Sequence, residues 1–210
     1  MLEAVDIGFG YDPGTPLLDH WSARFGPGEL VAVTGASGRG KSTLLYLLGL
    51  MLRPGSGSIR VHGEPAHALS DRRRAALRAT EFGFVFQDAA LDATRTILDN
   101  VTETALYRGQ DPRLARARAM VLLERFGVQL RAAVKPGQVS GGQAQRIALC
   151  RALLHSPPIV LADEPTGNLD PVSSRVVMRA FTDHAAAGNT VIIVTHDPTI
   201  LAQCHRQVDL

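Results

Sequence analysis

Between residues 34 and 43 the chain reads Thr34-Gly35-Ala36-Ser37-Gly38-Arg39-Gly40-Lys41-Ser42-Thr43. This stretch fits the phosphate-loop pattern G-x-x-x-x-G-K-[ST]. An apolar, β-branched run over residues 29–33 predicts a buried strand before it, and the leucine-rich run over residues 42–51 predicts a helix buried on most sides. A strand, a glycine loop and a helix in this order direct backbone N–H groups at an anion. A glycine-rich turn without chemistry is the alternative, but this context favours a nucleotide site.

Two side chains of the stretch have specific parts in such a site. We expect Lys41 to reach the β- and γ-phosphates of a nucleotide, and the Ser42 hydroxyl to ligate Mg²⁺. The other contacts come from the backbone around the anion, where glycine adopts angles that a side chain forbids. The predicted cofactor-binding residues of this loop are Gly35, Ala36, Ser37, Gly38, Arg39, Gly40, Lys41, Ser42 and Thr43.

The composition is that of an ordinary globular chain. Its 210 residues suffice for one domain, with 45% apolar and 20% charged residues, and its net charge of +2 is too small to indicate nucleic acid as the main partner. Cys150 and Cys204 form no disulfide framework, which favours a reducing compartment. No apolar run approaches the roughly 20 residues of a membrane span, and residues 1–4 begin no signal peptide. We therefore expect a cytosolic location.

The first half of the chain alternates short strands with turns. Strand-like patterns cover residues 4–11, 17–25 and 58–61, so antiparallel strands precede and follow the phosphate loop. A helix is predicted over residues 71–80, and a buried strand over residues 82–86 that ends at Gln87.

From residue 88 to about 156 the pattern becomes helical. One helix is predicted to begin near Ile97, and a second at Asp111-Pro112. The apolar side chains of the second helix are expected on one face: Leu114, Ala117, Val121 and Phe126.

The segment 111–135 is also basic, with six cationic side chains against two acidic ones. A solvated helix face is the favoured interpretation, and a surface for membrane headgroups or nucleic acid is the alternative.

Two continuous apolar runs, at residues 159–162 and 190–194, predict strands covered on both faces, with a crossover helix at 171–187 between them. The first run ends in Asp163-Glu164. Phosphate-loop enzymes place the Walker B carboxylate, which holds Mg²⁺, at such a strand end, and we assign that role to Asp163. Glu164 is suited to orient and deprotonate an attacking water. A simple loop start is the alternative for an isolated acidic pair.

A second anion site is predicted at Ser140-Gly141-Gly142-Gln143, which precedes an amphipathic helix over residues 144–154. Ser140 is a good N-cap, and the two glycines leave the first-turn N–H groups accessible. A purely structural cap is the alternative.

Together these motifs resemble the nucleotide-binding domain of an ABC transporter, over nearly the whole chain. Residues 140–143 match the signature motif of that family, Gln87 matches the Q-loop, and Asn168-Leu169-Asp170 matches the D-loop. His196 corresponds to the switch histidine, and Tyr11 to the aromatic residue that stacks on adenine. Residues 163–170 are further similar to the branch of lipoprotein-release, macrolide-efflux and cell-division ATPases.

The resemblance implies a single domain over residues 1–210 of the α/β class. Its RecA-like P-loop core covers 1–87 and 157–210 and carries an antiparallel β-subdomain, and its helical subdomain is inserted at about 88–156. Glu164, His196 and Gln87 would be catalytic, with His196 at the γ-phosphate rather than at the base. Mg²⁺ would be held by Ser42, Gln87 and Asp163. ATP would lie between the phosphate loop of one chain and residues 140–143 of a second copy or paralogue, and Asp170 would also belong to the cofactor-binding residues.

The implied function is ATP hydrolysis that drives a separate membrane permease, in export or extraction, from the cytoplasmic face of the cell membrane. The permease helix is expected in a cleft edged by Gln87 and residues 88–100. One alternative is a mechanotransmitting ATPase that moves a membrane partner without transport. Another is a soluble ABC protein that acts on DNA or ribosomes, although we expect no nucleic acid partner. The signature motif opposes a third, a small phosphate-loop kinase.

Overall fold

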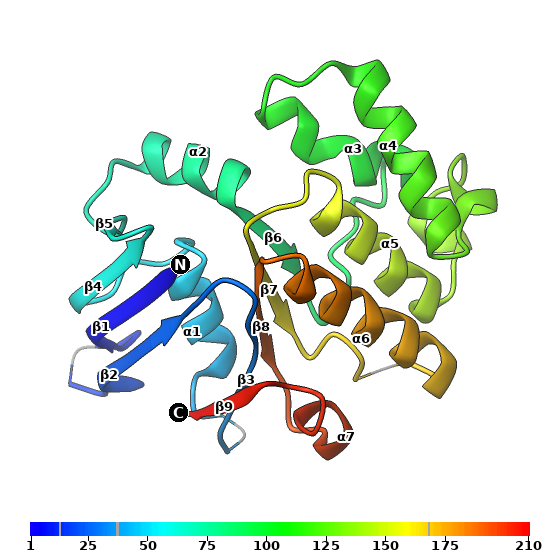
Figure 1. Ribbon diagram of the computed structural model, residues 1–210. Coiled ribbons are helices and arrows are strands. Elements are labelled where there is room, and N and C mark those ends of the chain that lie inside the picture. Colours follow the sequence, from blue (N-terminus) through cyan, green and yellow to red (C-terminus); the bar gives the residue numbers. More distant parts are fainter. Residues whose placement is uncertain (13, 37, 168) are drawn as a thin grey trace.

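A computed structural model describes residues 1–12, 14–36, 38–167 and 169–210 (Figure 1). Its strands form two sheets. The antiparallel sheet has the order β2-β1-β4-β5, and the parallel sheet has the order β6-β7-β8-β3-β9. The strands are β1 (Leu2–Phe9), β2 (Leu18–Phe25), β3 (Leu30–Thr34), β4 (Ser56–Val61), β5 (Glu64–Pro65), β6 (Phe82–Val85), β7 (Ile159–Asp163), β8 (Thr190–Val194) and β9 (Arg206–Asp209).

Helices cover the parallel sheet, and three of them form the layer at the upper right of Figure 1 (α3, α4 and α5). The helices are α1 (Lys41–Leu48), α2 (Asp71–Glu81), α3 (Ile97–Tyr107), α4 (Pro112–Arg125), α5 (Gly141–Leu153), α6 (Pro171–Ala186) and α7 (Pro198–Leu201), with 3₁₀ turns η1 (Gln129–Arg131) and η2 (Pro136–Gln138). This mixed arrangement confirms the predicted α/β class with an antiparallel sheet beside a parallel one.

The central strands bury side chains on both faces, as their unbroken apolar sequences predict. In β8, Val191 and Ile193 join the hydrophobic cluster under α3, α5 and α6. Ile192 and Val194 join the other cluster, with α1 and the antiparallel sheet. The same alternation divides β7, so one sheet serves as the wall between two cores.

Parallel pairing brings the predicted chemistry to one edge of this sheet. Val33 is paired with Val194, and Asp163 with Val194, so β3, β7 and β8 end side by side. The residues that follow β3 and β8, and the last residue of β7, therefore face the same space, as do ligand sites of open α/β sheets.

The predicted apolar face of α4 is confirmed only at Phe126, which is buried, and is wrong for the other three residues, which are exposed. Leu114 is 61% exposed and Val121 is 65% exposed, whereas Ala115, Ala119 and Leu123 are buried. The helix carries apolar residues on both faces, so periodicity alone does not identify the inner one. Small alanine side chains let α4 approach α3 closely, and that packing decides the orientation.

Strand β9 was not predicted, because its Arg-Gln-Val-Asp sequence has no strand signal. It forms by pairing in parallel with the edge of β3, with Val31 opposite Arg206 and Thr34 opposite Asp209. The Trp21 indole N–H donates to the Asp209 carbonyl at 3.0 Å and connects β9 to β2. Within the described part of the chain, no helix is long and apolar enough to cross a membrane.

Candidate functional site

The phosphate loop connects β3 to α1 and depends on glycine at its end. Gly40, the N-cap of α1, has a φ of 92°, in the left-handed region. A Cβ on Gly40 would also lie 2.7 Å from Cγ of Leu17, so both the backbone angle and the space exclude a side chain. Because Gly40 has no side chain to cap α1, the first N–H groups of the helix are available to an anion.

Lys41 extends back over this loop. Its Nζ donates to the carbonyl oxygens of Gly35 at 2.9 Å and Ala36 at 3.0 Å. The ammonium group thus lies where the loop encloses the anion-binding space. Gly38 and Arg39 are exposed along the same loop, and the predicted contact at Ser37 lies outside the described residues.

A cavity of about 710 Å³ brings the separate motifs together. It lies at the carboxyl edge of the parallel sheet and receives side chains from the segments after β3, β6, β7 and β8. Its lining includes Tyr11, Leu17, Gly35, Gly38, Gly40, Lys41, Ser42, Thr43, Gln87, Asp163, Glu164, Val194 and His196.

Asp163 is the buried acid of this cavity, with 7% of its surface exposed. Burial raises the pKa of this carboxyl group and outweighs the hydrogen bond from Ser42 and the charge of Lys41, which favour the carboxylate. A cation beside Asp163 would restore the charged form.

The oxygen donors around Asp163 fit Mg²⁺. The Ser42 hydroxyl and the Gln87 amide line the same cavity as this carboxylate. The described residues contain no group of three or more His, Cys, Asp or Glu side chains able to hold a metal. A magnesium site does not need such a group, because Mg²⁺ uses one or two carboxylates and takes its remaining ligands from phosphate and water.

Glu164 is held by the residues that follow β8. His196 Nδ1 lies 2.7 Å from Glu164 Oε1, and the Thr195 hydroxyl donates to Oε2 at 3.3 Å. The φ of Glu164 is 42°, an uncommon value for a residue with a side chain. We expected His196 at a phosphate and away from the base; the structure instead joins the imidazole to Glu164.

Tyr11 lies at the opening of the cavity. Its hydroxyl group is 3.2 Å from Thr43 Oγ1, and its ring meets Phe9 edge-on at 5.0 Å. The ring is 65% exposed, so one side is available to a flat ligand.

The helix cap predicted at residues 140–143 is present but lies outside this cavity. Ser140 and Gln143 cap α5 reciprocally, with Ser140 Oγ accepting from the Gln143 N–H and Gln143 Oε1 accepting from the Ser140 N–H. Asp170 caps α6 by accepting from the Val172 and Ser173 N–H groups. The Ser173 hydroxyl, which donates to the same carboxylate at 2.6 Å, lowers the pKa of Asp170.

The α5 N-terminus is nevertheless close to the catalytic candidates. A small cavity of about 130 Å³ is lined by Gly141 together with Gln87 and Glu164, which also line the large one. Gly142 lies beside the Asp170 cap, because a Cβ placed on it would be 3.7 Å from Asp170 Oδ2. Asn168 of the D-loop motif lies outside the described residues.

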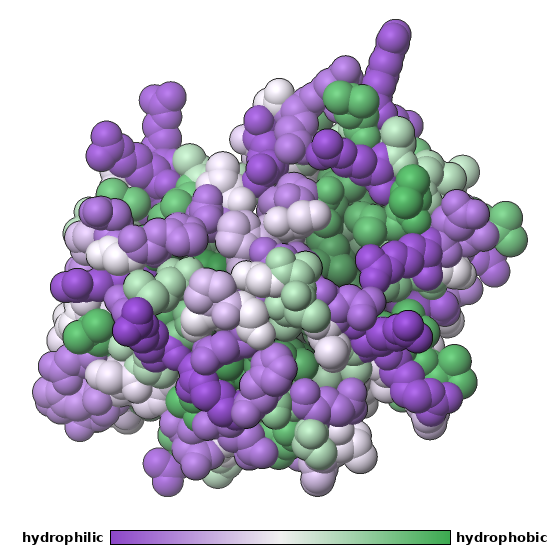
Figure 2. Space-filling model, in the orientation of Figure 1, coloured by the Kyte–Doolittle hydropathy of each residue, from purple (hydrophilic) through white to green (hydrophobic). Residues whose placement is uncertain are grey.

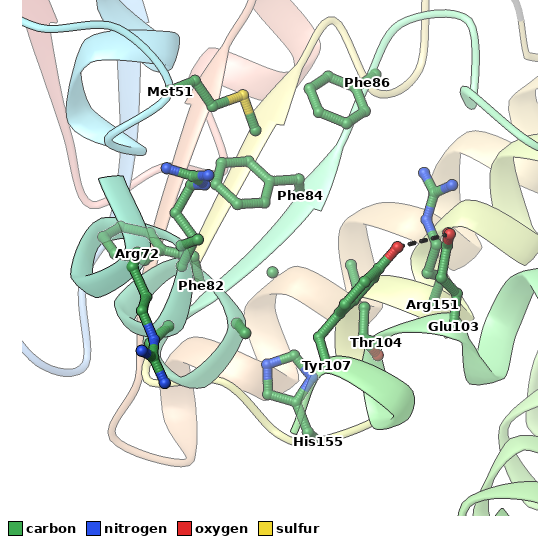
Figure 3. A pocket seen from close by; sticks show the side chains of 16 residues that line it. Met51, Arg72, Phe82, Phe84, Phe86, Glu103, Thr104, Tyr107, Arg151 and His155 are labelled. Atoms are coloured by element: carbon green, nitrogen blue, oxygen red, sulfur yellow. Dashed lines mark hydrogen bonds between the residues drawn. The ribbon is translucent and has the colours of Figure 1, made fainter. Parts of the chain in front are cut away.

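A further cavity, of about 590 Å³, was not predicted in this place (Figure 3). Phe82, Phe84 and Phe86 form a stacked row along and beyond β6, with ring centroids 5.9 Å apart at each step. Most of the other lining residues come from α2, α3, the C-terminal part of α5 and the segments that follow α1 and α5. They include Met51, Arg72, Ala76, Thr104, Tyr107, Arg151 and His155. The signal in the sequence was the alternation Phe82-x-Phe84-x-Phe86.

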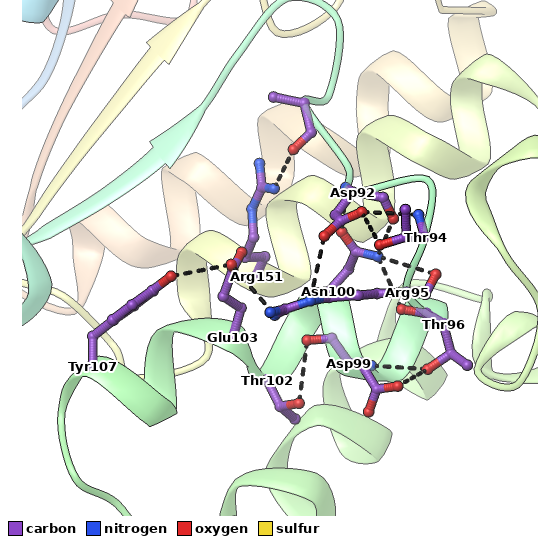
Figure 4. Close-up of polar contacts among 11 residues, drawn as sticks. Asp92, Thr94, Arg95, Thr96, Asp99, Asn100, Thr102, Glu103, Tyr107 and Arg151 are labelled. Carbon is purple, nitrogen blue, oxygen red and sulfur yellow. Dashed lines mark hydrogen bonds and ion pairs between the residues drawn. The ribbon is translucent and has the colours of Figure 1, made fainter.

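The segment 88–100, predicted as the edge of a partner cleft, does not line this cavity. Hydrogen bonds within the segment stabilise it (Figure 4). The fully buried Asn100 side chain accepts from the Asp92 N–H at 2.7 Å and donates to the carbonyls of Asp92 and Thr96. The Asp92 carboxylate in turn accepts from Thr94, which lowers the pKa of Asp92. Asp92 therefore stabilises this loop, and α3 lines the 590 Å³ cavity on this side.

Comparison with known proteins agrees with these motifs. A family model described as ABC transporter matches residues 18–167. The chain is 46% identical over 194 residues to the macrolide export ATP-binding/permease protein MacB of Chromobacterium violaceum, covering 92% of this chain and 30% of that protein. It is 43% identical over 213 residues to the lipoprotein-releasing system ATP-binding protein LolD of Bordetella pertussis, covering 100% of this chain and 92% of that protein.

Solved structures share the whole fold. A dimeric, post-hydrolysis state of the ATP-binding cassette MJ0796 bound to ADP and Pi has a TM-score of 0.94 at 32% identity. The similarity covers 100% of this chain and 94% of that chain.

Proposed function

The chain belongs to the ABC transporter family, and from this premise we propose that it hydrolyses ATP to drive a separate membrane permease, in export or extraction. One observation carries the proposal. A single cavity of about 710 Å³ gathers Lys41, the first residue of α1, with Asp163 and Glu164 at the end of β7. A phosphate-binding cation, a buried acid and a second carboxylate in one cavity are the parts that nucleotide hydrolysis requires.

Binding uses the residues at the base of the cavity. Lys41 exchanges its contacts with the carbonyls of Gly35 and Ala36 for the β- and γ-phosphate oxygens, and the α1 N-terminus donates to the same anion. Tyr11 stacks on the adenine with its exposed ring. Ser42, Gln87 and Asp163 would hold Mg²⁺, which would neutralise charge on the phosphates.

Glu164 acts as the general base. It accepts a proton from a water whose oxygen bonds to the γ-phosphorus, while the bond between that phosphorus and the β–γ bridging oxygen breaks to give ADP and inorganic phosphate. His196 and Thr195 hold the carboxylate in position through their contacts with its two oxygens. His196 is thus a positioning residue for Glu164.

The site is completed by a second copy of the chain or a paralogue, turned head to tail. Residues 140–143 and Asp170 lie outside the nucleotide cavity of their own chain, and Ser140 and Gly141 are exposed. The N–H groups of Gly141 and Gly142 are then free to bind the phosphate held by the other chain. Support comes from the dimeric state of MJ0796.

The membrane partner occupies the apolar cavity of about 590 Å³ through a cytoplasmic helix. Support comes from its row of Phe82, Phe84 and Phe86, which offers an apolar floor, and from the exposed Arg72 in its lining. The chain would then sit on the inner face of the cell membrane. We infer the division into a core and a helical subdomain at about 88–156, with the cavity where the two meet.

The test is release of inorganic phosphate from ATP by the purified chain in the presence of Mg²⁺. Lys41→Ala should abolish it, because the cation that faces the β- and γ-phosphates is lost. The matched control is Lys135→Ala, since Lys135 is the only other lysine of the sequence and is exposed outside the cavity. Normal hydrolysis by Lys41→Ala would mean that the nucleotide site lies elsewhere.

A further inference from the structure

The turn between α3 and α4 exposes apolar side chains that the proposed function does not use. Leu106 and Tyr107 end α3 and are 61% and 72% exposed, and Leu114 in the first turn of α4 is 61% exposed. We call residues 106–114 the hairpin tip. In Figure 2, green atoms reach the surface among purple ones at the top, where Figure 1 shows this turn.

The charges on and around the hairpin tip are mainly positive. Asp111 is its one acid, and its carboxylate caps α4 by accepting from the Arg113 N–H at 2.8 Å. The exposed Arg113 and Arg118 side chains form no ion pair within the described residues. Arg108 is different, because its guanidinium donates to the carbonyls of Ala79 and Thr80 at the end of α2.

The hairpin tip adjoins the apolar cavity proposed for the membrane partner. Tyr107 lines that cavity, and Arg72, on the opposite side of it, begins a second exposed basic pair with Arg73 (Figure 3). Arg72 and Arg73 likewise form no ion pair within the described ranges. If a membrane protein fills the cavity, as the proposed function holds, the same face is directed at the bilayer.

We propose that the hairpin tip contacts an anionic lipid bilayer, with Leu106, Tyr107 and Leu114 at the headgroup level and Arg113 against lipid phosphates. Exposed leucine and tyrosine beside arginine is the composition of interfacial membrane contacts. Nucleic acid would leave the leucines without a partner, and a protein partner would have to neutralise the arginines. The orientation of the hairpin tip toward the bilayer rests on the proposed function. Its binding to lipid needs no nucleotide.

The test uses the full chain with an environment-sensitive fluorophore on Leu114→Cys, in a Cys204→Ser background; Cys150 is buried. Vesicles of phosphatidylcholine with phosphatidylglycerol should raise the emission, and high salt or pure phosphatidylcholine should suppress the rise. The matched site is Leu130→Cys, since Leu130 is 88% exposed and lies beyond the far end of the 14-residue helix α4. That label should not respond.

The charge part is tested separately with the same label. Arg113→Ala should weaken vesicle binding about fivefold, the worth of one basic residue near an anionic surface. Arg131→Ala removes the same charge beyond the other end of α4 and should leave binding unchanged.

The proposal would be overturned if the label at Leu114→Cys gave no response or if the label at Leu130→Cys responded equally. It would also be overturned if the chain bound neutral vesicles equally well, or if the two arginine variants had equal effects on binding. The added change Lys41→Ala should keep the vesicle response. Failure of the hydrolysis test and failure of this one are therefore distinguishable.

Discussion

Replacing Glu164 by glutamine removes the proposed base while leaving its surroundings in place. In the variant Glu164→Gln, the side-chain carbonyl oxygen can still accept a hydrogen bond from His196 or Thr195. The backbone N–H at this position still donates to the Val194 carbonyl at 2.9 Å. The variant loses the negative charge and, with it, the ability to take a proton. A general base contributes roughly 10²–10⁴-fold in rate, which corresponds to about 3–5 kcal/mol in the activation barrier.

The expected result is slow turnover with intact nucleotide binding. Lys41, Ser42 and Asp163 are unchanged, so the affinity for ATP with Mg²⁺ should stay close to that of the unmodified chain. Single-turnover phosphate release measures the chemical step, and fluorescent-nucleotide titration measures binding. Because the bound ATP is no longer hydrolysed, the dimer of two chains that encloses it should persist. Size-exclusion chromatography with ATP should therefore show an accumulated dimer.

The matched control is Glu81→Gln. Glu81 is also a glutamate beside a histidine, with Oε2 2.8 Å from His62 Nε2, but it ends α2 and lies outside the nucleotide cavity. Its replacement should leave the rate of phosphate release unchanged. Turnover of Glu164→Gln at the rate of the unmodified chain would refute the assignment of the base, whereas loss of ATP binding would show that the carboxylate helps hold the nucleotide.

Three further changes test other parts of the structure. His196→Ala should slow phosphate release and spare ATP binding, because Glu164 loses the imidazole 2.7 Å from its Oε1; unchanged single-turnover rates would exclude the positioning role. Asn100→Ala should lower the free energy of unfolding in urea by about 3 kcal/mol, since three hydrogen bonds to the backbone around Asp92 and Thr96 are lost at about 1 kcal/mol each; a loss below about 1 kcal/mol would contradict this. Burial lowers the pKa of His155 to about 4, so the unfolded chain binds the proton more readily between about pH 4 and 6.5. Stability should therefore fall as the pH drops through that range, and His155→Phe should flatten the decline; equal slopes in urea titrations would count against it.

The local patterns of the sequence determined the catalytic edge of the fold. The spacing of Gly35, Gly40 and Lys41 predicts the loop, because few other sequences wrap a backbone around a phosphate. Unbroken apolar runs identify β7 and β8, since only strands covered on both faces need them. Parallel strands then place Asp163 and His196 at one edge without further information.

Tertiary structure decided what those patterns leave open. Both faces of α4 carry apolar residues, so close packing of Ala115 and Ala119 chose the inner face and turned Leu114 outward. Polar β9 became a strand only because the edge of β3 offered unpaired backbone groups. The contact between His196 and Glu164 joins positions 32 apart in the chain, and no periodicity encodes it. Such pairings depend on how separate elements are arranged in space, which local sequence patterns do not determine.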